Sequence, residues 1–293
     1  QKIRLIINTD AKNEADDQFC IVHALLTPKF DIRGIIGAQF GTRRTTESMQ
    51  ESVDECVKLL DLMDLTDKVK VYPGAREEIK SETEYEYSEG AKLLVEEAHK
   101  EDDRPLYAIF LGPLTDMACA YLHDPTIADK LTVIWIGGGR YPEGGTEFNL
   151  SNDIKAANVI LQSPIELWQV PMNVYTKMLV SFAELEEKVR PYGKVGRYLF
   201  DQMMEFTASL PDNRTWPSGE CWSLGDSPTI GLLLNPQPML SHQGEAPVIG
   251  EDMSYHFTGK GRQIRIYDDV NVRFILEDMF CKLRLNYGDQ KND

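Results

Sequence analysis

Three aspartates near the start of the chain are the residues best suited to chemistry. Asp10 is followed closely by Asp16 and Asp17. Crowded carboxylates repel one another unless a cation or hydrogen bonds compensate them, and a helix dipole offsets only about 0.3–1 kcal/mol per group. A hard divalent cation that prefers oxygen ligands, Ca²⁺ or Mg²⁺, would resolve this conflict. The alternative is that Asp16 and Asp17 are ordinary acidic residues at a helix start, and this segment alone favours neither interpretation.

Two later segments offer further oxygen ligands for such a cation. Leu111 ends an apolar run and precedes Gly112-Pro113, where a loop leaves a backbone carbonyl free to meet an ion. Asp226 stands shortly before Pro228, at the start of a segment with helical spacing. Taken alone, Asp226 is more typical of a helix N-cap. The metal interpretation therefore depends on these segments converging in space.

A loop between these segments carries a carboxylate and an amide. Glu147 and Asn149 alternate around Phe148, so both side chains can point the same way. Together they suit a sugar diol, which needs both acceptors and donors, although ordinary loop chemistry explains the pair equally well. Trp222, shortly before Asp226, is a candidate for stacking on a planar base, and a role as a core aromatic is equally well supported.

The elements that must position these residues alternate between strand and helix. Apolar runs predict strands, and apolar residues three and four positions apart predict helices. The predicted strands cover residues 2–8, 32–38, 69–72, 106–111, 131–136, 166–170, 254–258 and 263–267. The predicted helices cover residues 16–26, 45–62, 88–99, 114–122, 154–161, 181–209, 228–234 and 270–285. Residues 75–87, rich in Glu and Lys without apolar periodicity, are expected to form a surface excursion.

This alternation is the pattern of right-handed β-α-β units around a mostly parallel sheet. We therefore expect a single α/β domain over residues 1–293, with a doubly wound, mostly parallel sheet and flanking helices. In such sheets ligands bind beyond the carboxyl ends of the strands. Asp10 and Leu111 stand at such strand ends, which is why they are the residues to examine.

The composition of the chain limits the classes of ligand that the protein is expected to bind. The formal net charge of −16 argues against nucleic-acid polymers, which need a basic surface. No apolar run approaches the roughly 18 residues of a membrane span, so we expect a soluble protein that binds a small molecule.

The five scattered cysteines have no zinc or redox spacing. Because the chain begins at Gln1, we expect that a tag or an export signal was removed, and either the cytoplasm or export fits.

Five segments, taken in this order, resemble the inosine-uridine-preferring nucleoside hydrolase family. That family opens with Asp-x-Asp-Pro-Gly-x-Asp-Asp after a strand, and continues with Gly-Pro-Leu-Thr-Asn, a Gly-Gly-Gly turn, Glu-Phe-Asn and a late Asp at a helix start. The counterparts here are residues 10–17, 112–116, 137–139, 147–149 and 226. The resemblance spans nearly the whole chain and implies the nucleoside hydrolase fold. It also implies calcium-dependent release of base and ribose from a nucleoside or N-riboside.

The resemblance also implies roles for single residues. Asp10, Asp17 and Asp226 would bind Ca²⁺ together with the main-chain carbonyl of Leu111. Asp10 would in addition act as general base on the attacking water, whose pKa the metal lowers. The residues that would hold the ribose are Asp16, Glu147 and Asn149. Similar proteins are commonly dimers or tetramers, so a homodimer or homotetramer is expected.

The chain departs from the family pattern in three places. Residues 12–15 replace the Pro-Gly turn of the first loop, which could bring Asn13 or Glu14 nearer the sugar. Gln39 takes the place of an Asn after the second strand and is a further candidate for substrate binding. Gly225 stands where many members carry the His that protonates the departing base. Leaving-group protonation typically contributes about 10²–10⁴-fold to rate, so either another acid serves or the leaving group needs little help.

Two alternative functions, a binding protein without turnover and a phosphatase, can be compared with the sequence. A ribose- or nucleoside-binding protein without turnover would keep the pocket; the missing His favours it, while Asp10 opposes it, because binding alone needs no water-activating base. A phosphatase of the haloacid dehalogenase type requires two Asp separated by one residue at the first strand end. Because Asn8 stands two residues before Asp10, that alternative fits poorly.

Overall fold

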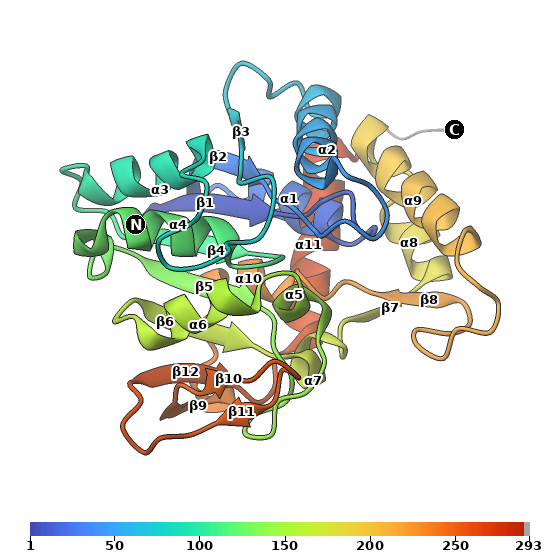
Figure 1. Ribbon diagram of the computed structural model, residues 1–293. Helices are drawn as coiled ribbons and strands as arrows, with labels where there is room; N and C mark the ends of the chain where they lie inside the picture. The colour runs from blue at the N-terminus through green and yellow to red at the C-terminus, as the bar shows by residue number, and fades with distance from the viewer. Residues whose placement is uncertain (290–293) are drawn as a thin grey trace.

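A computed structural model describes residues 1–289 and contains one eight-stranded central sheet (Figure 1). From edge to edge the strands are β3 (Val71–Pro73), β2 (Phe30–Gly37), β1 (Ile3–Thr9), β4 (Leu106–Phe110), β5 (Thr132–Ile136), β6 (Glu166–Val170), β12 (Gln263–Tyr267) and β9 (Ser241–Glu245). All neighbours pair in parallel except β9, which runs antiparallel to β12. The predicted α/β fold with a mostly parallel sheet and flanking helices is confirmed.

Helices cover both faces of this sheet. One face packs against α3 (Glu89–His99), α4 (Thr115–His123) and α6 (Ile154–Gln162). The other packs against α1 (Asp17–Leu25), α2 (Ser48–Leu62), α8 (Phe182–Lys188), α9 (Gly193–Ala208), α10 (Pro228–Leu234) and α11 (Val272–Tyr287). Two apolar cores result, one on each side of the sheet. Of the described residues, no helix is both long enough and apolar enough to span a membrane.

The first strand illustrates why the sheet is central. All seven residues of β1 are buried, as expected for a parallel strand covered on both faces. Successive side chains alternate between the two cores: Leu5 and Ile7 pack on the side of α1, and Ile6 packs on the side of α3. A continuous apolar run is therefore needed here, and it places Asp10 directly beyond the sheet edge.

Smaller elements surround the carboxyl edge of the sheet. Two short helices, α5 (Phe148–Ser151) and α7 (Met172–Tyr175), follow β5 and β6. Two antiparallel ribbons, β7 (Leu179–Ser181) with β8 (Cys221–Ser223) and β10 (Val248–Ile249) with β11 (Tyr255–His256), lie outside the main sheet (Figure 1). Apart from the region of β11, these strands and short helices were absent from the prediction. Of them, α5, α7 and β8 supply residues to the walls of the site described next.

Candidate active site

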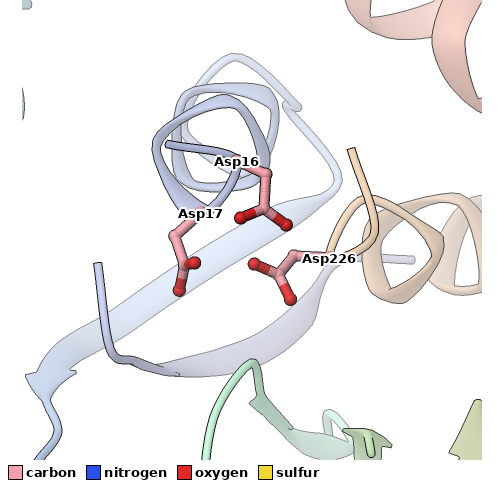
Figure 2. A group of neighbouring side chains, drawn as sticks. All are labelled: Asp16, Asp17 and Asp226. Carbon is pink, nitrogen blue, oxygen red and sulfur yellow. The ribbon is translucent and has the colours of Figure 1, made fainter. Parts of the chain in front are cut away.

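The aspartates singled out in the sequence converge at the carboxyl edge of the sheet. Asp16 and Asp17 stand at the start of α1, and Asp226 stands two residues before α10. Figure 2 shows the three carboxylates pointing toward one another across a shared space. One carboxylate oxygen from each lies within 4.8 Å of the others, and all three residues are buried. Elements separated by about two hundred positions in the chain thus supply one compact group of oxygen ligands.

Asp10 lines the same cavity, although it lies outside that tight group of three. It follows β1, is only 2% exposed, and its Oδ2 has no hydrogen-bond partner among the described residues. A β-carbon at Gly112 would come within 2.8 Å of the Asp10 carboxyl carbon, so glycine is needed beside this side chain. A buried carboxylate oxygen without a donor is costly unless a ligand meets it.

Burial sets the protonation of this cluster. It raises the pKa of Asp10 well above the usual value, and the neighbouring Asp17 raises it further. The pKa values of Asp16 and Asp226 are raised for the same reasons, burial first and neighbouring aspartates second. Holding all of these groups ionised therefore costs free energy unless a positive charge compensates them. Thr9 supplies one compensating contact, because its hydroxyl donates to Asp17 Oδ2 over 2.6 Å.

Leu111 and Asn149 both line the aspartate cavity and contact each other. Asn149 Nδ2 donates to the carbonyl oxygen of Leu111 over 3.0 Å and to that of Ile136 over 2.6 Å. These bonds fix α5 against the ends of β4 and β5. The Leu111 carbonyl accepts this amide hydrogen and keeps a second lone pair for another ligand.

Glu147 is held by four hydrogen bonds. Its Oε1 accepts from the backbone nitrogens of Gly138 and Leu150, over 2.7 Å and 2.9 Å. Its Oε2 accepts from the backbone nitrogen of Asn149 over 2.9 Å and from the Tyr175 hydroxyl over 2.8 Å. Burial raises the pKa of Glu147, while these donors lower it. The carboxylate therefore has a fixed orientation at the boundary of the cavity.

The first loop reaches the cavity through its unusual residues. Asn13 and Glu14 both line the aspartate cavity, and Asn13 Oδ1 is buried without a partner. The loop is anchored from outside, because Arg44 donates to the carbonyl of Asn13 and the Lys12 ammonium lies 3.1 Å from Glu55 Oε2. Burial raises the pKa of Glu14 to about 7, with Asp17 adding to the shift.

A wider cavity of about 370 Å³ opens next to the aspartate cavity. The two share Glu14, Asp16, Glu147, Phe148, Tyr175 and Gly225. The outer cavity adds Trp222, which is buried, and Trp216, which is half exposed. This volume lies within the range of small-molecule sites. The outer cavity is thus an aromatic chamber that opens onto the carboxylates.

The wall at Gly225 is closed by Tyr175. A β-carbon at Gly225 would lie 3.0 Å from Tyr175 Cδ1, tighter than most real contacts. A larger side chain at position 225 would therefore require the Tyr175 ring to move. The ring comes from α7 and its hydroxyl is tied to Glu147, so one side chain spans both cavities.

Gln39, a sequence candidate for substrate binding, lies outside the lining of both cavities. Its Nε2 donates to Thr115 Oγ1 and to the carbonyl of Asn152, both over 3.1 Å, and its Oε1 accepts from the backbone nitrogen of Gly41 over 2.8 Å. All its polar atoms are occupied by protein. Gln39 therefore braces the loops behind the site.

Tyr175 is the functional candidate that the sequence reasoning missed. The rule that ligands bind beyond strand ends applies to β6 as it does to β1 and β4. Applied there, it would have singled out residues 171–176. The aromatic chamber as a whole was harder to find, because Trp216 and Met253 reach it from loops with no regular spacing.

The residues present fit a bound divalent cation. The donor set consists of oxygens alone, four buried carboxylates and a backbone carbonyl, which is the preference of hard cations. One oxygen of this set, Asp10 Oδ2, lacks a donor. The raised pKa values of Asp10, Asp16 and Asp226 agree with this, because a bound cation would favour the ionised carboxylates.

Comparison with known proteins places the chain among nucleoside hydrolases. A family model described as inosine-uridine preferring nucleoside hydrolase matches residues 5–277. Uridine nucleosidase 1 of Arabidopsis thaliana is 24% identical, with 84% of this chain and 86% of that protein covered. A pyrimidine-specific ribonucleoside hydrolase, RihB, of Escherichia coli (strain SE11) is also 24% identical, with 80% of each covered.

Solved structures share the fold. A plant nucleoside hydrolase superimposes with a TM-score of 0.78 at 18% identity, covering 97% of this chain and 99% of that one. A purine-preferring ribonucleoside hydrolase from Gardnerella vaginalis gives a TM-score of 0.75 at 19% identity, covering 96% and 98%. The likeness extends over nearly the whole chain.

Proposed function

The chain belongs to the inosine-uridine preferring nucleoside hydrolase family, and from that membership we propose that it hydrolyses the N-glycosidic bond of ribonucleosides or related N-ribosides with a bound Ca²⁺ ion. The names of its relatives specify uridine and pyrimidine ribonucleosides as substrates. The observation that carries the proposal is the convergence of buried aspartates from β1, α1 and the start of α10 in one cavity.

The residues that would hold the ion are Asp10, Asp17, Asp226 and the carbonyl of Leu111. We propose Ca²⁺ rather than Mg²⁺, because Ca²⁺ accepts many protein oxygens, whereas Mg²⁺ usually keeps several waters. When bound, such an ion offsets the carboxylate charges and lowers the pKa of the attacking water. The close approach of Asp16 to Asp17 and Asp226 also makes its carboxylate available to the ion or to a sugar hydroxyl beside it.

Asp10 is the proposed general base. It stands at the tip of β1 with one free oxygen, so it can accept a proton from water inside the cavity. The ribosyl group develops positive charge as the glycosidic bond lengthens. Carboxylates aimed at that charge stabilise the transition state more than the ground state.

The sugar and the base would occupy different cavities. The proposed hydroxyl-binding groups are Asp16, Asn13, Glu147 and Asn149, all of which line the aspartate cavity. The base would then lie in the aromatic chamber beside Trp222. This division places the scissile bond at the residues that the two cavities share.

The test combines metal removal with substitution of the base. Hydrolysis of p-nitrophenyl riboside and a panel of nucleosides is measured with Ca²⁺ and with a chelator, for the wild type and for Asp10→Asn. We expect chelation to stop turnover and Asp10→Asn to lower kcat by about 10²–10⁴-fold. Asp129→Asn, an exposed carboxylate in the described structure, is the matched control and should keep wild-type rates.

Three results would argue against the proposal in different ways. Near-wild-type turnover by Asp10→Asn would remove Asp10 from the mechanism. Undiminished turnover after chelation would remove the metal. If the Ca²⁺-loaded protein binds ribose but releases no base from any substrate, the protein is a binding protein and the hydrolase proposal fails.

A further inference from the structure

The walls of the site are strongly anionic. Six carboxylic residues line the aspartate cavity: Asp10, Glu14, Asp16, Asp17, Glu147 and Asp226. One divalent cation offsets two of their formal charges. Asn13 Oδ1, buried without a partner, adds a further acceptor. Among the described residues that line either cavity, the single cationic side chain is Arg43, which is exposed at the rim of the outer chamber.

The aromatic chamber next to these carboxylates suits a flat cation. Phe148, Tyr175, Trp216 and Trp222 line it, together with the polarizable side chains of Met172 and Met253. The quadrupole of an aromatic ring attracts a cation placed over its face, and the attraction is stronger when water is excluded. Glu14 faces the same chamber and reaches into the aspartate cavity as well. The place where the base must leave the sugar is therefore bordered by π faces and by negative charge.

Proton donors aimed at this place are few. No histidine lines either cavity in the described part of the chain. The Tyr175 hydroxyl donates to Glu147, and the Tyr175 ring closes the wall at Gly225. Ser151 donates to the carbonyl of Phe148, and Ser223 donates to that of Tyr175. These hydroxyl donors are directed into the protein, away from a departing base. Among the described lining residues, Glu14 and Asp16 are the remaining acids that face the chamber, and the Glu14 variant described below tests whether Glu14 protonates the base.

The electron balance of the reaction connects these observations. When the C–N bond breaks, both electrons stay on the base nitrogen, and the sugar carbon bonds to the oxygen of water, whose proton passes to a carboxylate. A neutral base leaves as an anion unless it is protonated, and an anion would be repelled here. A base that is positively charged in the substrate leaves neutral and needs no proton.

On the premise of the proposed function, we propose that the preferred substrates are N-ribosides whose leaving group carries a positive charge, a pyridinium or an N-alkylated purinium ring. The acidic cavity attracts the charged substrate, the aromatic chamber stacks on its ring, and the neutral product is released. Neutral nucleosides, which depend on protonation of the base, are poor substrates of the same site.

A matched pair of nucleosides tests this preference. Guanosine and 7-methylguanosine differ by one methyl group and one positive charge, and nicotinamide riboside supplies the pyridinium class. Initial rates are measured with the Ca²⁺-loaded protein, with p-nitrophenyl riboside as a neutral substrate whose leaving group needs no proton. We expect kcat/KM for 7-methylguanosine to exceed that for guanosine by at least about 10²-fold, the lower end of what protonation contributes.

The variant Glu14→Gln separates the pocket's contribution to kcat/KM from the intrinsic reactivity of charged nucleosides. Removing this charge should lower kcat/KM for the two cationic substrates about tenfold more than for p-nitrophenyl riboside. The exposed Glu186→Gln on α8 is the matched control and should leave all ratios unchanged. If Glu14→Gln instead lowers guanosine hydrolysis the most, Glu14 protonates the base and the proposal is overturned.

The remaining outcomes distinguish this proposal from the function on which it rests. Rates for guanosine within tenfold of those for 7-methylguanosine overturn the charge preference and leave nucleoside hydrolysis standing. The same holds if p-nitrophenyl riboside is cleaved and neither cationic substrate is. If no riboside of any kind is cleaved, the proposed hydrolase function itself fails, and the preference fails with it.

Discussion

Tyr175 shows how one side chain can organise this site. Its hydroxyl is the only side-chain donor to Glu147 found among the described residues, since the other three donors are backbone nitrogens. Those backbone donors set the direction of the carboxylate, and the phenol donates to its Oε2. Burial and the Glu147 carboxylate both raise the pKa of Tyr175 well above its usual range, so the phenol stays protonated and keeps donating.

The first prediction concerns this hydroxyl. Tyr175→Phe keeps the ring that closes the wall at Gly225 but removes the donor to Glu147. A hydrogen bond to a charged group contributes about 1.5–3 kcal/mol, so we expect kcat/KM to fall by roughly 10–100-fold with a raised KM. Steady-state kinetics on p-nitrophenyl riboside measure this, because its leaving group needs no acid.

The control for this prediction is Tyr85→Phe, on the surface excursion away from both cavities. It should match the wild type in kcat and KM. Equal kinetics for Tyr175→Phe and Tyr85→Phe would show that Glu147 needs no support from the phenol.

Individual residues were predictable to the extent that a strand leads directly to them. Asp10 follows an apolar run and Asp17 begins a helix, so the strand-end rule locates both from sequence alone. Gln39 also follows a strand, yet its amide turns into the protein toward Thr115. Side-chain direction after a strand depends on loop partners far away in the chain, and sequence spacing does not encode those partners.

At the scale of elements, helix α1 connects the site to helix α11. It begins at Asp17 and carries the fully buried His23 near its other end. His23 Nε2 lies 2.7 Å from Asp278 Oδ2 on α11. Burial lowers the pKa of His23, and the adjacent Asp278 opposes this shift. The position of α1, and with it Asp17, therefore depends on a buried, neutral imidazole.

The second prediction follows from the sign of this shift. The unfolded chain takes up a proton at His23 below about pH 6.5, whereas the folded protein resists it. The free energy of unfolding should therefore fall as pH drops below about 6.5. In His23→Gln this contribution is absent, so between pH 7 and pH 5 the wild type should lose up to about 2 kcal/mol more than the variant. Urea denaturation at both pH values measures the difference.

Asp278→Asn provides the comparison for His23. Because Asp278 raises the pKa of His23, its neutralisation should lower that pKa further and steepen the loss of stability toward low pH. Parallel pH dependences for the wild type and both variants would mean that His23 binds a proton equally well in the folded protein.

Elements with strong periodicity were predicted almost to the residue, and weakly patterned ones were not. The strand at 166–170 and the helix at 228–234 match β6 and α10 in full. The helical region expected over 181–209 consists of two helices, α8 and α9, separated at Val189–Tyr192 near Pro191 and Gly193, a break that the prediction did not locate. The edge strand β9 was missed because it has no buried residue and no apolar side chain; pairing with β12 makes it a strand.

At the scale of the whole molecule, the acidic site lies where the two cores meet the end of the sheet. Leu111 and Ile136, both wall residues, belong to the core on the side of α1, and Leu150 of α5 belongs to the core on the side of α3. The site is thus part of the packed interior. Charge repulsion within it must oppose folding of the entire chain, whose net charge is already −16.

The last prediction tests that coupling without any substrate. An ion that binds only the folded protein stabilises it by about 2.7 kcal/mol at a free concentration of 100 Kd. For a protein of this size, that corresponds to a rise in Tm of roughly 4–5 °C. We therefore expect Ca²⁺ to raise the Tm measured by calorimetry above the value in chelator, and Mg²⁺ at the same concentration to raise it less.

The variant Asp17→Asn/Asp226→Asn removes two ligand charges and the repulsion between them. It should be at least as stable as the wild type in chelator and gain little from Ca²⁺. A Tm that Ca²⁺ raises equally in the wild type and in this variant would place the ion elsewhere on the acidic surface, because the only difference between the two proteins is the buried cluster.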